Sequence, residues 1–253
     1  MFALERQKMI LELLEKNGAV TVSNLSSILS VTEETVRRDL EKLEKQEALR
    51  RTHGGAVPID ESTYEFSLEK RKSTNVEAKE KLAEIALSHI ASGDTIFLDA
   101  STTTFFIAKG LKKRNNITVI TNSIRVIAEL SGYPEIKTIA VGGIVSENQS
   151  FVGSLAEANI RENYVANKMF FSSKGITVDA GILESNEKEC GIKQKMLKNS
   201  GTKFYLCDSS KIGRIGFVKL CAFDDIDYFI SDAEVPDKLK YKLSDSDVKI
   251  INV

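Results

Sequence analysis

The sequence TEETVRRDLEKL at residues 32–43, followed by RRTHGG at residues 50–55, decides the fold of the first part of this chain. Val36, Leu40 and Leu43 recur at the i, i+4 and i+7 positions of a helix, so they form one apolar stripe. We therefore predict an amphipathic helix that packs this stripe on a small core and exposes its opposite face.

The exposed face of this helix carries short polar and long cationic side chains in its N-terminal half. Thr32 stands where its hydroxyl can cap the first turn by accepting a hydrogen bond from an unpaired amide. A helix that reads DNA presents this half to base edges and phosphates. The residues that we expect to contact DNA are Thr32, Thr35, Arg37, Arg38 and Lys42.

Two helices precede the DNA-reading helix, and the second of them is short. Ile10 and Leu14 share one face of the first, Thr21 opens the second, and Ser30 begins a tight turn into the third. Two short helices joined by so brief a turn are typical of the helix-turn-helix motif.

A small hairpin follows these helices. Residues 48–57, with Gly54 and Gly55 expected at the tip, suit the wing of a winged helix-turn-helix. Further candidates for DNA contact in this wing are Arg50, Arg51 and His53. Any single element would also fit an ordinary amphipathic helix with a solvated face and a glycine turn. Their combination favours a DNA-binding domain over residues 1–57.

The charge of residues 1–57 is balanced, because lysines and arginines are as numerous as aspartates and glutamates. Phosphate binding favours a basic surplus, so a neutral domain is expected to bind DNA weakly as a monomer. Two copies double the contacts and read two half-sites. We therefore expect a homo-oligomer, a dimer or a tetramer, on double-stranded operator DNA.

The length and composition indicate two domains. At 253 residues and 42% hydrophobic content, the chain can build one small domain and one substantial one. Residues 58–75 begin at a proline and show no sustained period, so we expect a linker there and a second domain over residues 76–253. With a net charge of −1 and no long apolar run or signal sequence, we expect a soluble, cytoplasmic protein without membrane contact.

Cysteine and histidine usage gives no sign of a metal site. Cys190, Cys207 and Cys221 show no CxxC spacing. His53 and His89, the two histidines, are far apart and lack neighbours at ligand spacing. We expect neither a metal nor another cofactor.

From Ser92 onward, short β-rich runs alternate with helical segments, which is typical of an α/β domain with a mostly parallel sheet. Before these strands, Asn75 is expected to cap the N-terminus of a long helix that extends to about Ile90. The predicted strands are residues 95–98, 117–120, 138–141, 168–171, 203–207, 228–230 and 249–253.

The first five of these strands end in polar residues or glycine, at the edge where open α/β sheets bind their ligands. The hydroxyl run Ser101–Thr104 feeds the N-terminus of a helix, so it predicts an anion site. Lys174 and Lys211 can add positive charge. We predict a small phosphorylated ligand whose hydroxyls donate to Asp99, Asn122 and Asp208. The full set of expected ligand-binding residues is Asp99, Ser101, Thr102, Thr103, Thr104, Thr121, Asn122, Gly142, Gly143, Ser173, Lys174, Gly175, Asp208 and Lys211.

A structural interpretation of the same residues stays open. Serine and threonine after a strand are common helix caps, and single lysines there are usually solvated. Five such strand ends in one sheet favour a real pocket over this interpretation.

The whole chain resembles the DeoR family of bacterial transcriptional regulators of sugar metabolism. The resemblance rests on residues 31–40, 51–56, 99–104, 121–123, 142–143, 151–153 and 208–211. It implies a winged helix-turn-helix followed by a sensor domain similar in fold to ribose-5-phosphate isomerase. It also implies a repressor of a sugar-catabolic operon that a phosphorylated sugar releases from DNA. Ser101 stands where the family often has glycine, which leaves the identity of the sugar open.

Two other functions are compatible with the sequence. One is a sugar-phosphate isomerase or deaminase with a DNA-binding arm, in which Asp99, Asp208 and Glu189 would offer acid–base groups. No activated pair or histidine accompanies these carboxylates, so we expect no catalytic residues. The other is a transcriptional activator, because the sign of regulation depends on where the operator lies relative to the promoter.

Overall fold

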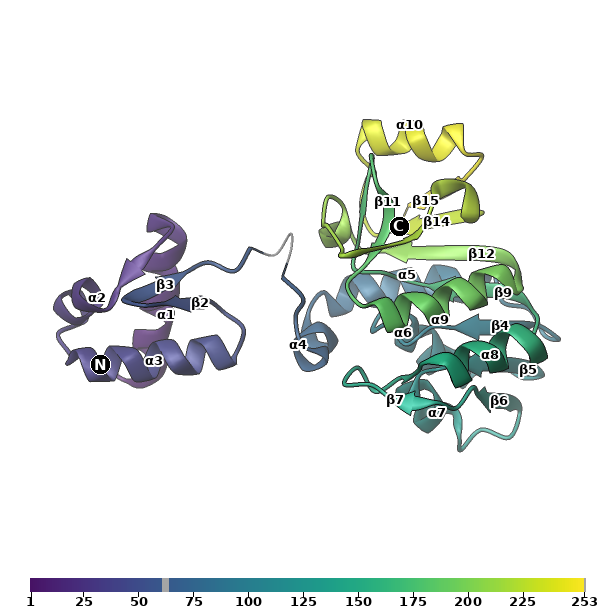
Figure 1. Ribbon diagram of the computed structural model, residues 1–253, viewed down its shortest axis with the longest axis horizontal. Coiled ribbons are helices and arrows are strands. Elements are labelled where there is room, and N and C mark those ends of the chain that lie inside the picture. The colour runs from purple at the N-terminus through teal and green to yellow at the C-terminus, as the bar shows by residue number, and fades with distance from the viewer. Residues whose placement is uncertain (61–63, 253) are drawn as a thin grey trace. The chain divides into compact units, whose positions relative to one another are not determined.

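The computed structural model describes residues 1–60 and 64–252 and divides the chain into two compact units, Met1–Phe66 and Ser67–Val253 (Figure 1). The boundary falls inside the predicted linker of residues 58–75, of which residues 61–63 lie outside the described residues.

Within residues 1–60, three helices and three short strands form the first unit. Their bounds are α1 Ala3–Asn17, β1 Val20–Thr21, α2 Val22–Leu29, α3 Glu33–Lys45, β2 Arg50–Thr52 and β3 Gly55–Val57. Strand β3 pairs antiparallel with both β1 and β2. The predicted winged helix-turn-helix is therefore confirmed, with α2 and α3 as its two helices and β2–β3 as its wing.

The helix starts follow from local side-chain chemistry. The Thr21 hydroxyl accepts a hydrogen bond from the Asn24 amide at 3.2 Å, and the Thr32 hydroxyl accepts one from the Thr35 amide at 3.3 Å. Between these two helices, Ser30 adopts a left-handed conformation with φ of 51°. Both predicted caps and the tight turn between them are confirmed.

The tip of the wing differs from the prediction. His53 and Gly54 make the turn, whereas Gly55 lies inside β3 opposite Thr21. A Cβ atom on Gly55 would come 1.8 Å from the carbonyl oxygen of Val20. Gly55 is thus needed for the close pairing of β1 with β3.

A charged pair joins α1 to α3 beside the apolar core. Asp39 lies on the inner face of α3, where its Oδ2 accepts a hydrogen bond from Arg6 Nε and its Oδ1 one from Gln7 Nε2 at 3.3 Å. The Asp39 side chain is 3% exposed. The apolar part of this core contains Ile10, Leu14, Leu25, Leu29, Val36, Leu40, Leu43 and Leu49.

Within residues 64–252, seven parallel strands form the central sheet of the second unit, in the order β15-β14-β12-β9-β4-β5-β6. Their bounds are β4 Thr95–Leu98, β5 Ile117–Thr121, β6 Ile136–Ala140, β9 Ala166–Phe171, β12 Ser200–Cys207, β14 Tyr228–Ser231 and β15 Lys249–Asn252. The predicted α/β class and all seven predicted strands are confirmed; Val253 lies outside the described residues.

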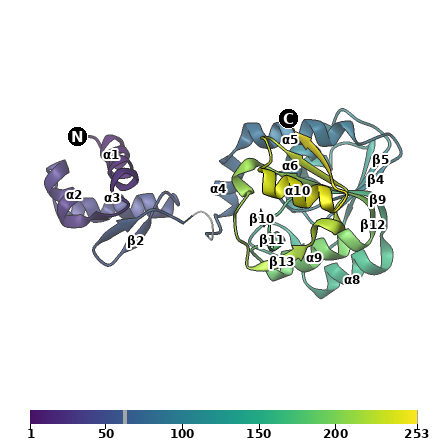
Figure 2. The ribbon, with the colours of Figure 1, turned by 90° about the horizontal axis from the view of Figure 1, so that it is seen from above.

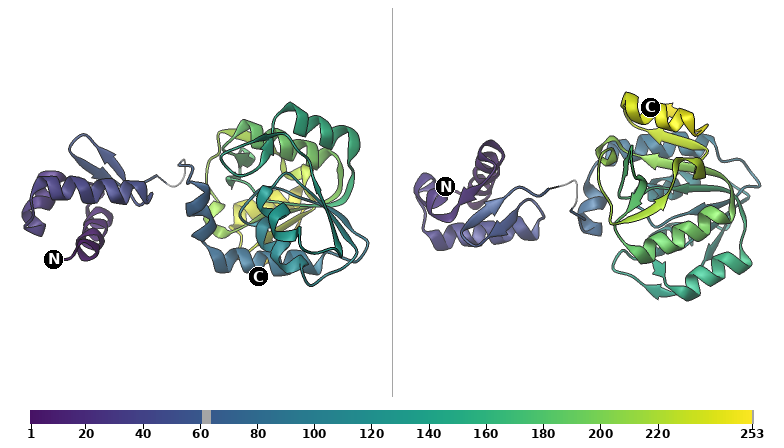
Figure 3. Two further views of the ribbon diagram at one scale, coloured as in Figure 1. Left: turned by 90° about the horizontal axis from the view of Figure 1, so that it is seen from below. Right: turned by 45° about the horizontal axis from the view of Figure 1, so that its top comes forward.

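Helices cover both faces of this sheet. Their bounds are α5 Val76–Ser88, α6 Thr104–Leu111, α7 Ile124–Leu130, α8 Ser154–Asn163, α9 Glu187–Lys198 and α10 Asp237–Asp245. Along β4, Ile96 and Leu98 share a core with α5, α6 and α7, whereas Phe97 faces the core of α8, α9 and α10. Figures 2 and 3 show the resulting three layers.

Several small elements were not anticipated from the sequence. They are the hairpin β7 Ile144–Val145 with β8 Phe151–Val152, the antiparallel sheet of β10 Gly175–Thr177, β11 Gly181–Glu184 and β13 Val218–Cys221, and the 3-10 turns η1 Ser209–Lys211 and η2 Phe223–Asp225. These strands have two to four residues, too few for a hydrophobic period.

The predicted linker is partly wrong. Residues Leu68–Ser73 form helix α4, and Lys79 of α5 donates to the carbonyl oxygens of Arg71 and Thr74. These contacts make α4 part of the second unit. Asn75, the expected cap of α5, does not cap it with its side chain.

Candidate DNA-binding surface and ligand site

The candidate DNA contacts on α3 lie on its exposed surface. The Thr32 and Thr35 hydroxyls are 2.9 Å apart. Arg38 Nε donates to Glu34 at 3.1 Å, and its side chain is 74% exposed. Arg37 forms a similar pair with Glu33 at 2.6 Å, and Lys42 is exposed one turn further on.

The wing presents the remaining candidates. Arg50, Arg51 and His53 are all exposed along β2 and the turn. Glu44 of α3 accepts a hydrogen bond from the backbone amide of Arg51 at 2.9 Å, which fixes β2 to α3. Cationic side chains of the wing and the first turns of α3 are thus available to an anionic partner.

The candidate ligand site lies where the order of strands in the sheet reverses. From β4 the chain builds β5 and β6 on one side, and then β9, β12, β14 and β15 on the other. The crevice at such a switch point is where open α/β sheets bind ligands. Asp208, Ser172, Asp99 and Asn122 follow the neighbouring strands β12, β9, β4 and β5.

Two hydroxyls of the run 101–104 hold the loop itself. Ser101 Oγ accepts a hydrogen bond from the Thr104 amide at 3.1 Å, and Thr104 Oγ1 donates to Asp99 Oδ1 at 2.7 Å. These two residues therefore fit the structural interpretation. Thr103 differs, because its hydroxyl accepts from Lys211 Nζ at 3.3 Å, while Thr102 is buried beside it.

Asp99 was expected to accept hydrogen bonds from ligand hydroxyls, but its oxygens are occupied by the protein. Oδ1 accepts from the Ser101 amide and the Thr104 hydroxyl, and Oδ2 accepts from the Ser172 amide at 3.2 Å. Lys193 Nζ lies 3.1 Å from Oδ2. Fully buried, Asp99 organises the loop instead of facing a ligand.

Lys211 lies between three of the strand ends. Its ammonium donates to Ser172 Oγ at 2.5 Å and lies 3.5 Å from Asp208 Oδ2. Burial opposes ionisation of Asp208, but Lys211, the Ser210 hydroxyl and the Asn75 amide together hold the pKa of this carboxyl below its usual value. Asp208 therefore keeps its negative charge at neutral pH, next to Lys211.

Four other expected ligand residues face the protein. Thr121 Oγ1 accepts from the Ser123 amide, and the Ser173 hydroxyl is 2.8 Å from the Tyr205 hydroxyl in the core. A Cβ atom on Gly143 would meet Ala156 at 2.9 Å, and one on Gly175 would meet the Arg214 carbonyl at 2.3 Å. The sequence signal at these positions came from close packing and turns, which use the same residue types as ligand loops.

Asn122 offers a buried acceptor that the described residues leave unsatisfied. Its Nδ2 donates to the Phe151 carbonyl at 3.2 Å, which fixes the orientation of the amide. Its Oδ1 has no hydrogen-bond partner among the described residues, although Asn122 is 1% exposed. A Cβ atom on Gly142 would meet nothing within 4 Å, so there is open space at that glycine. Lys174, the remaining candidate, is buried.

Lys79 belongs to the same cluster and was missed. It shares the apolar face of α5 with Leu82, Ala83 and Ala86. Burial, followed by the charge of Lys211, lowers the pKa of Lys79 to about 8; Arg71 and Arg125 act in the same direction. A lysine inside an apolar helix stripe was the signal that would have found it.

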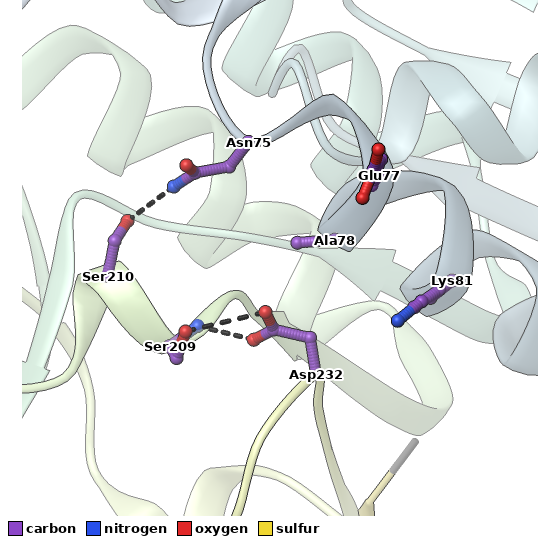
Figure 4. Close-up of a pocket in the computed structure, with 7 residues that line it drawn as sticks. All are labelled: Asn75, Glu77, Ala78, Lys81, Ser209, Ser210 and Asp232. Carbon is purple, nitrogen blue, oxygen red and sulfur yellow. Dashed lines mark hydrogen bonds between the residues drawn. The ribbon is translucent and has the colours of Figure 1, made fainter.

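A shallow pocket of about 440 Å³ adjoins these residues at the ends of β12 and β14 (Figure 4). Asn75 lies at its edge, where its Nδ2 donates to Ser210 Oγ at 2.9 Å and to Asp208 Oδ1 at 3.1 Å. On the other side, Asp232 accepts from the Ser209 amide. The lining is polar and carries both signs of charge, with Glu77 and Lys81 on α5.

Within residues 1–60 and 64–252, no group of three or more His, Cys, Asp or Glu side chains is arranged to hold a metal ion. In the same part of the chain, no helix has the length and apolar character needed to cross a membrane.

Both units match known protein families. Residues 6–62 match the DeoR-like helix-turn-helix domain, and residues 74–233 match the DeoR C terminal sensor domain. A ribose 5-phosphate isomerase A from Methanocaldococcus jannaschii overlaps 55% of each chain at 16% identity with a TM-score of 0.42.

The chain is similar to transcriptional regulators over most or all of their length. The HTH-type transcriptional regulator YulB of Bacillus subtilis is 42% identical, over 100% of this chain and 98% of that protein. The L-fucose operon activator of Haemophilus influenzae is 33% identical, over 97% and 98%. The HTH-type transcriptional repressor GlcR of Bacillus subtilis is 33% identical, over 92% and 89%. With both domains matched in order, the chain belongs to the DeoR family of DNA-binding transcriptional regulators.

Proposed function

We propose that this regulator represses a sugar-catabolic operon and loses affinity for its operator when a phosphorylated sugar occupies the ligand site. The observation that carries the proposal is the cluster of cations around Lys79. Lys79 is buried, and Lys211, Arg71 and Arg125 all lower its pKa. Asp208 raises this pKa, but it compensates only one of these positive charges, so the cluster favours a further anion. A phosphate dianion at the N-terminus of α6 is the partner that this arrangement favours.

The sugar part of the effector is supported by Asn122. Leaving its buried Oδ1 without a donor costs about 1–3 kcal/mol, and a ligand hydroxyl would remove that cost. We therefore propose Thr102, Thr103, Lys211 and Lys79 for the phosphate and Asn122 for a hydroxyl. The name of one relative, an L-fucose operon activator, agrees with regulation of a sugar operon.

The calorimetric test uses matched pairs of sugars and their phosphates. Phosphates should bind, and the parent sugars should not, because a neutral sugar leaves the cations without a counter-charge. Lys211→Ala should lose this binding, whereas Lys219→Ala, which removes an exposed lysine of β13, should retain it. Equal affinity for both members of every pair would refute the phosphate site.

Repression and release are tested on operator DNA. Saturating effector should weaken binding of the wild-type protein but not that of Lys211→Ala, which would stay on its operator as a super-repressor. Transcription from the regulated promoter should rise when the gene is deleted. A fall would instead identify an activator, the sign carried by the name of the fucose relative.

The second unit is proposed to bind its sugar phosphate without converting it. Asp99 is held by protein donors and Lys193, and Glu189 accepts hydrogen bonds from Ser146 and Ser150, so these carboxylates are poorly placed as general bases. Incubation with effector, followed by NMR of the sugar, should return it unchanged; a new sugar phosphate would identify an enzyme.

We also propose that the protein acts as a homo-oligomer, a dimer or a tetramer, because residues 1–57 carry no net basic charge with which to bind DNA as a monomer. Analytical ultracentrifugation of the protein with operator fragments containing one or two half-sites tests this. A monomer on a single site would contradict it.

A further inference from the structure

A buried lysine lies directly behind the candidate ligand site. Lys193 extends from α9, and its ammonium contacts the ends of three strands. It donates to the Ser172 carbonyl at 2.7 Å and to Glu184 Oε2, and it lies 3.1 Å from Asp99 Oδ2. Ser172 follows β9, Glu184 is the last residue of β11, and Asp99 follows β4.

Lys193 offsets part of the buried negative charge of this cluster. Asp99 is 0% exposed and Glu184 is 6% exposed, so two carboxylates are buried beside one ammonium. Burial lowers the pKa of Lys193, but Glu184 and Asp99 raise it above its ordinary value, which keeps the lysine charged. An unpaired buried carboxylate is strongly unfavourable.

The negative charge of Asp99 lies next to the proposed anion site, so anion binding depends on a positive charge that offsets it. Its carboxylate supports the hydroxyl loop through the Ser101 amide and the Thr104 hydroxyl. A negative charge directly beneath an anion site repels the anion, and the repulsion is stronger in a buried environment than in water. Lys193 supplies the positive charge that offsets it.

Ser172 connects Lys193 with the exposed side of the site. Its carbonyl accepts from Lys193 Nζ, and its hydroxyl accepts from Lys211 Nζ and donates to the Leu206 carbonyl. The residue that supports Lys211 is therefore itself held in place by Lys193.

We propose that Lys193 is a positioning residue for anion binding, which neutralises Asp99 beneath the hydroxyl loop and fixes Ser172 under Lys211 without touching the ligand. The proposal rests on the proposed binding of a phosphorylated effector.

The test measures inorganic phosphate binding to the full-length protein by calorimetry in three variants. Glu184→Gln keeps Lys193 and removes the competing carboxylate, so phosphate affinity should rise. Lys193→Met with Glu184→Gln leaves Asp99 uncompensated, and affinity should fall by about tenfold to a hundredfold, the range known for groups that orient metal ligands. Lys193→Arg with Glu184→Gln restores the charge, and affinity should largely recover.

Folding and operator binding provide the controls. Circular dichroism reports whether each variant folds, and operator affinity without phosphate should equal that of the wild type, because the DNA-binding helices belong to the other unit. If Lys193→Met with Glu184→Gln binds phosphate as tightly as Glu184→Gln alone, the proposed role of Lys193 is wrong. It is also wrong if Lys193→Arg with Glu184→Gln folds but does not recover phosphate affinity.

If the variant with Lys193→Met does not fold, the phosphate affinity of Glu184→Gln alone tests the proposal. A rise in its phosphate affinity supports the charge argument, and a tenfold fall overturns it. Failure of the wild-type protein to bind phosphate and every sugar phosphate would instead remove the proposed function and this inference together.

Discussion

Replacing Arg38 by alanine should weaken binding to the operator without disturbing the fold. The Arg38 side chain is 74% exposed, and its Nε pairs with Glu34, one turn earlier on α3, at 3.1 Å. Such exposed pairs contribute about 0.3–0.5 kcal/mol, so the stability of the first unit should barely change. A lost base or phosphate contact costs about 1–3 kcal/mol in each half-site, or about 5-fold to 150-fold in affinity.

The chain offers a matched control on the same helix. Lys45 is also 74% exposed and pairs with Glu41 at 2.8 Å, but it lies seven residues further on, in the last turn of α3. Lys45→Ala removes the same charge and the same kind of ion pair from the end of the helix that faces away from the groove in this motif. Its operator affinity should stay within about threefold of the wild type.

Gel-shift titrations at one fixed ionic strength measure both variants, and circular dichroism verifies that both fold. Salt concentration must be held constant because phosphate contacts make affinity strongly salt-dependent. Equal operator affinity of Arg38→Ala and Lys45→Ala would refute the assignment of the N-terminal half of α3 to DNA.

Three further predictions follow from buried groups. Asp39→Ala leaves Arg6 buried without its carboxylate and should lower the free energy of unfolding of the first unit by about 3–5 kcal/mol, measured with urea; an unchanged midpoint would contradict the pairing. A fragment of residues 67–253 should fold and bind effector, whereas residues 76–253 should melt about 2–10 °C lower, because loss of α4 leaves Lys79 with unsatisfied donors; equal melting temperatures would argue against this. Because burial and the Lys211 charge lower the pKa of Lys79 to about 8, an incoming phosphate should raise it again, so binding should take up about half a proton at pH 8 and weaken as the pH rises further. Calorimetry in two buffers of different ionisation enthalpy measures this uptake, and Lys79→Met should abolish it.

The sequence by itself determined the local features of this protein. The apolar stripe of Val36, Leu40 and Leu43 and the cap Thr32 predicted α3, because helix period and capping act over a few residues. The seven strands of the sheet were likewise found from their β-rich runs and from the polar residues that end them. Family resemblance then supplied the function at the level of a DNA-binding regulator.

Only the tertiary structure decided which polar groups face a ligand and which hold the protein together. Asp99 and Lys211 both follow strands in the sequence, but Asp99 is surrounded by protein donors while Lys211 reaches across three strand ends. Lys79 and Lys193 lie on helices far along the chain from these loops, and only the crossover of the strands brings them to one edge of the sheet. Local sequence marks Lys79 as a lysine inside an apolar helix stripe, but it does not identify the partners of either lysine. Burial and charge compensation depend on residues that are neighbours in space alone.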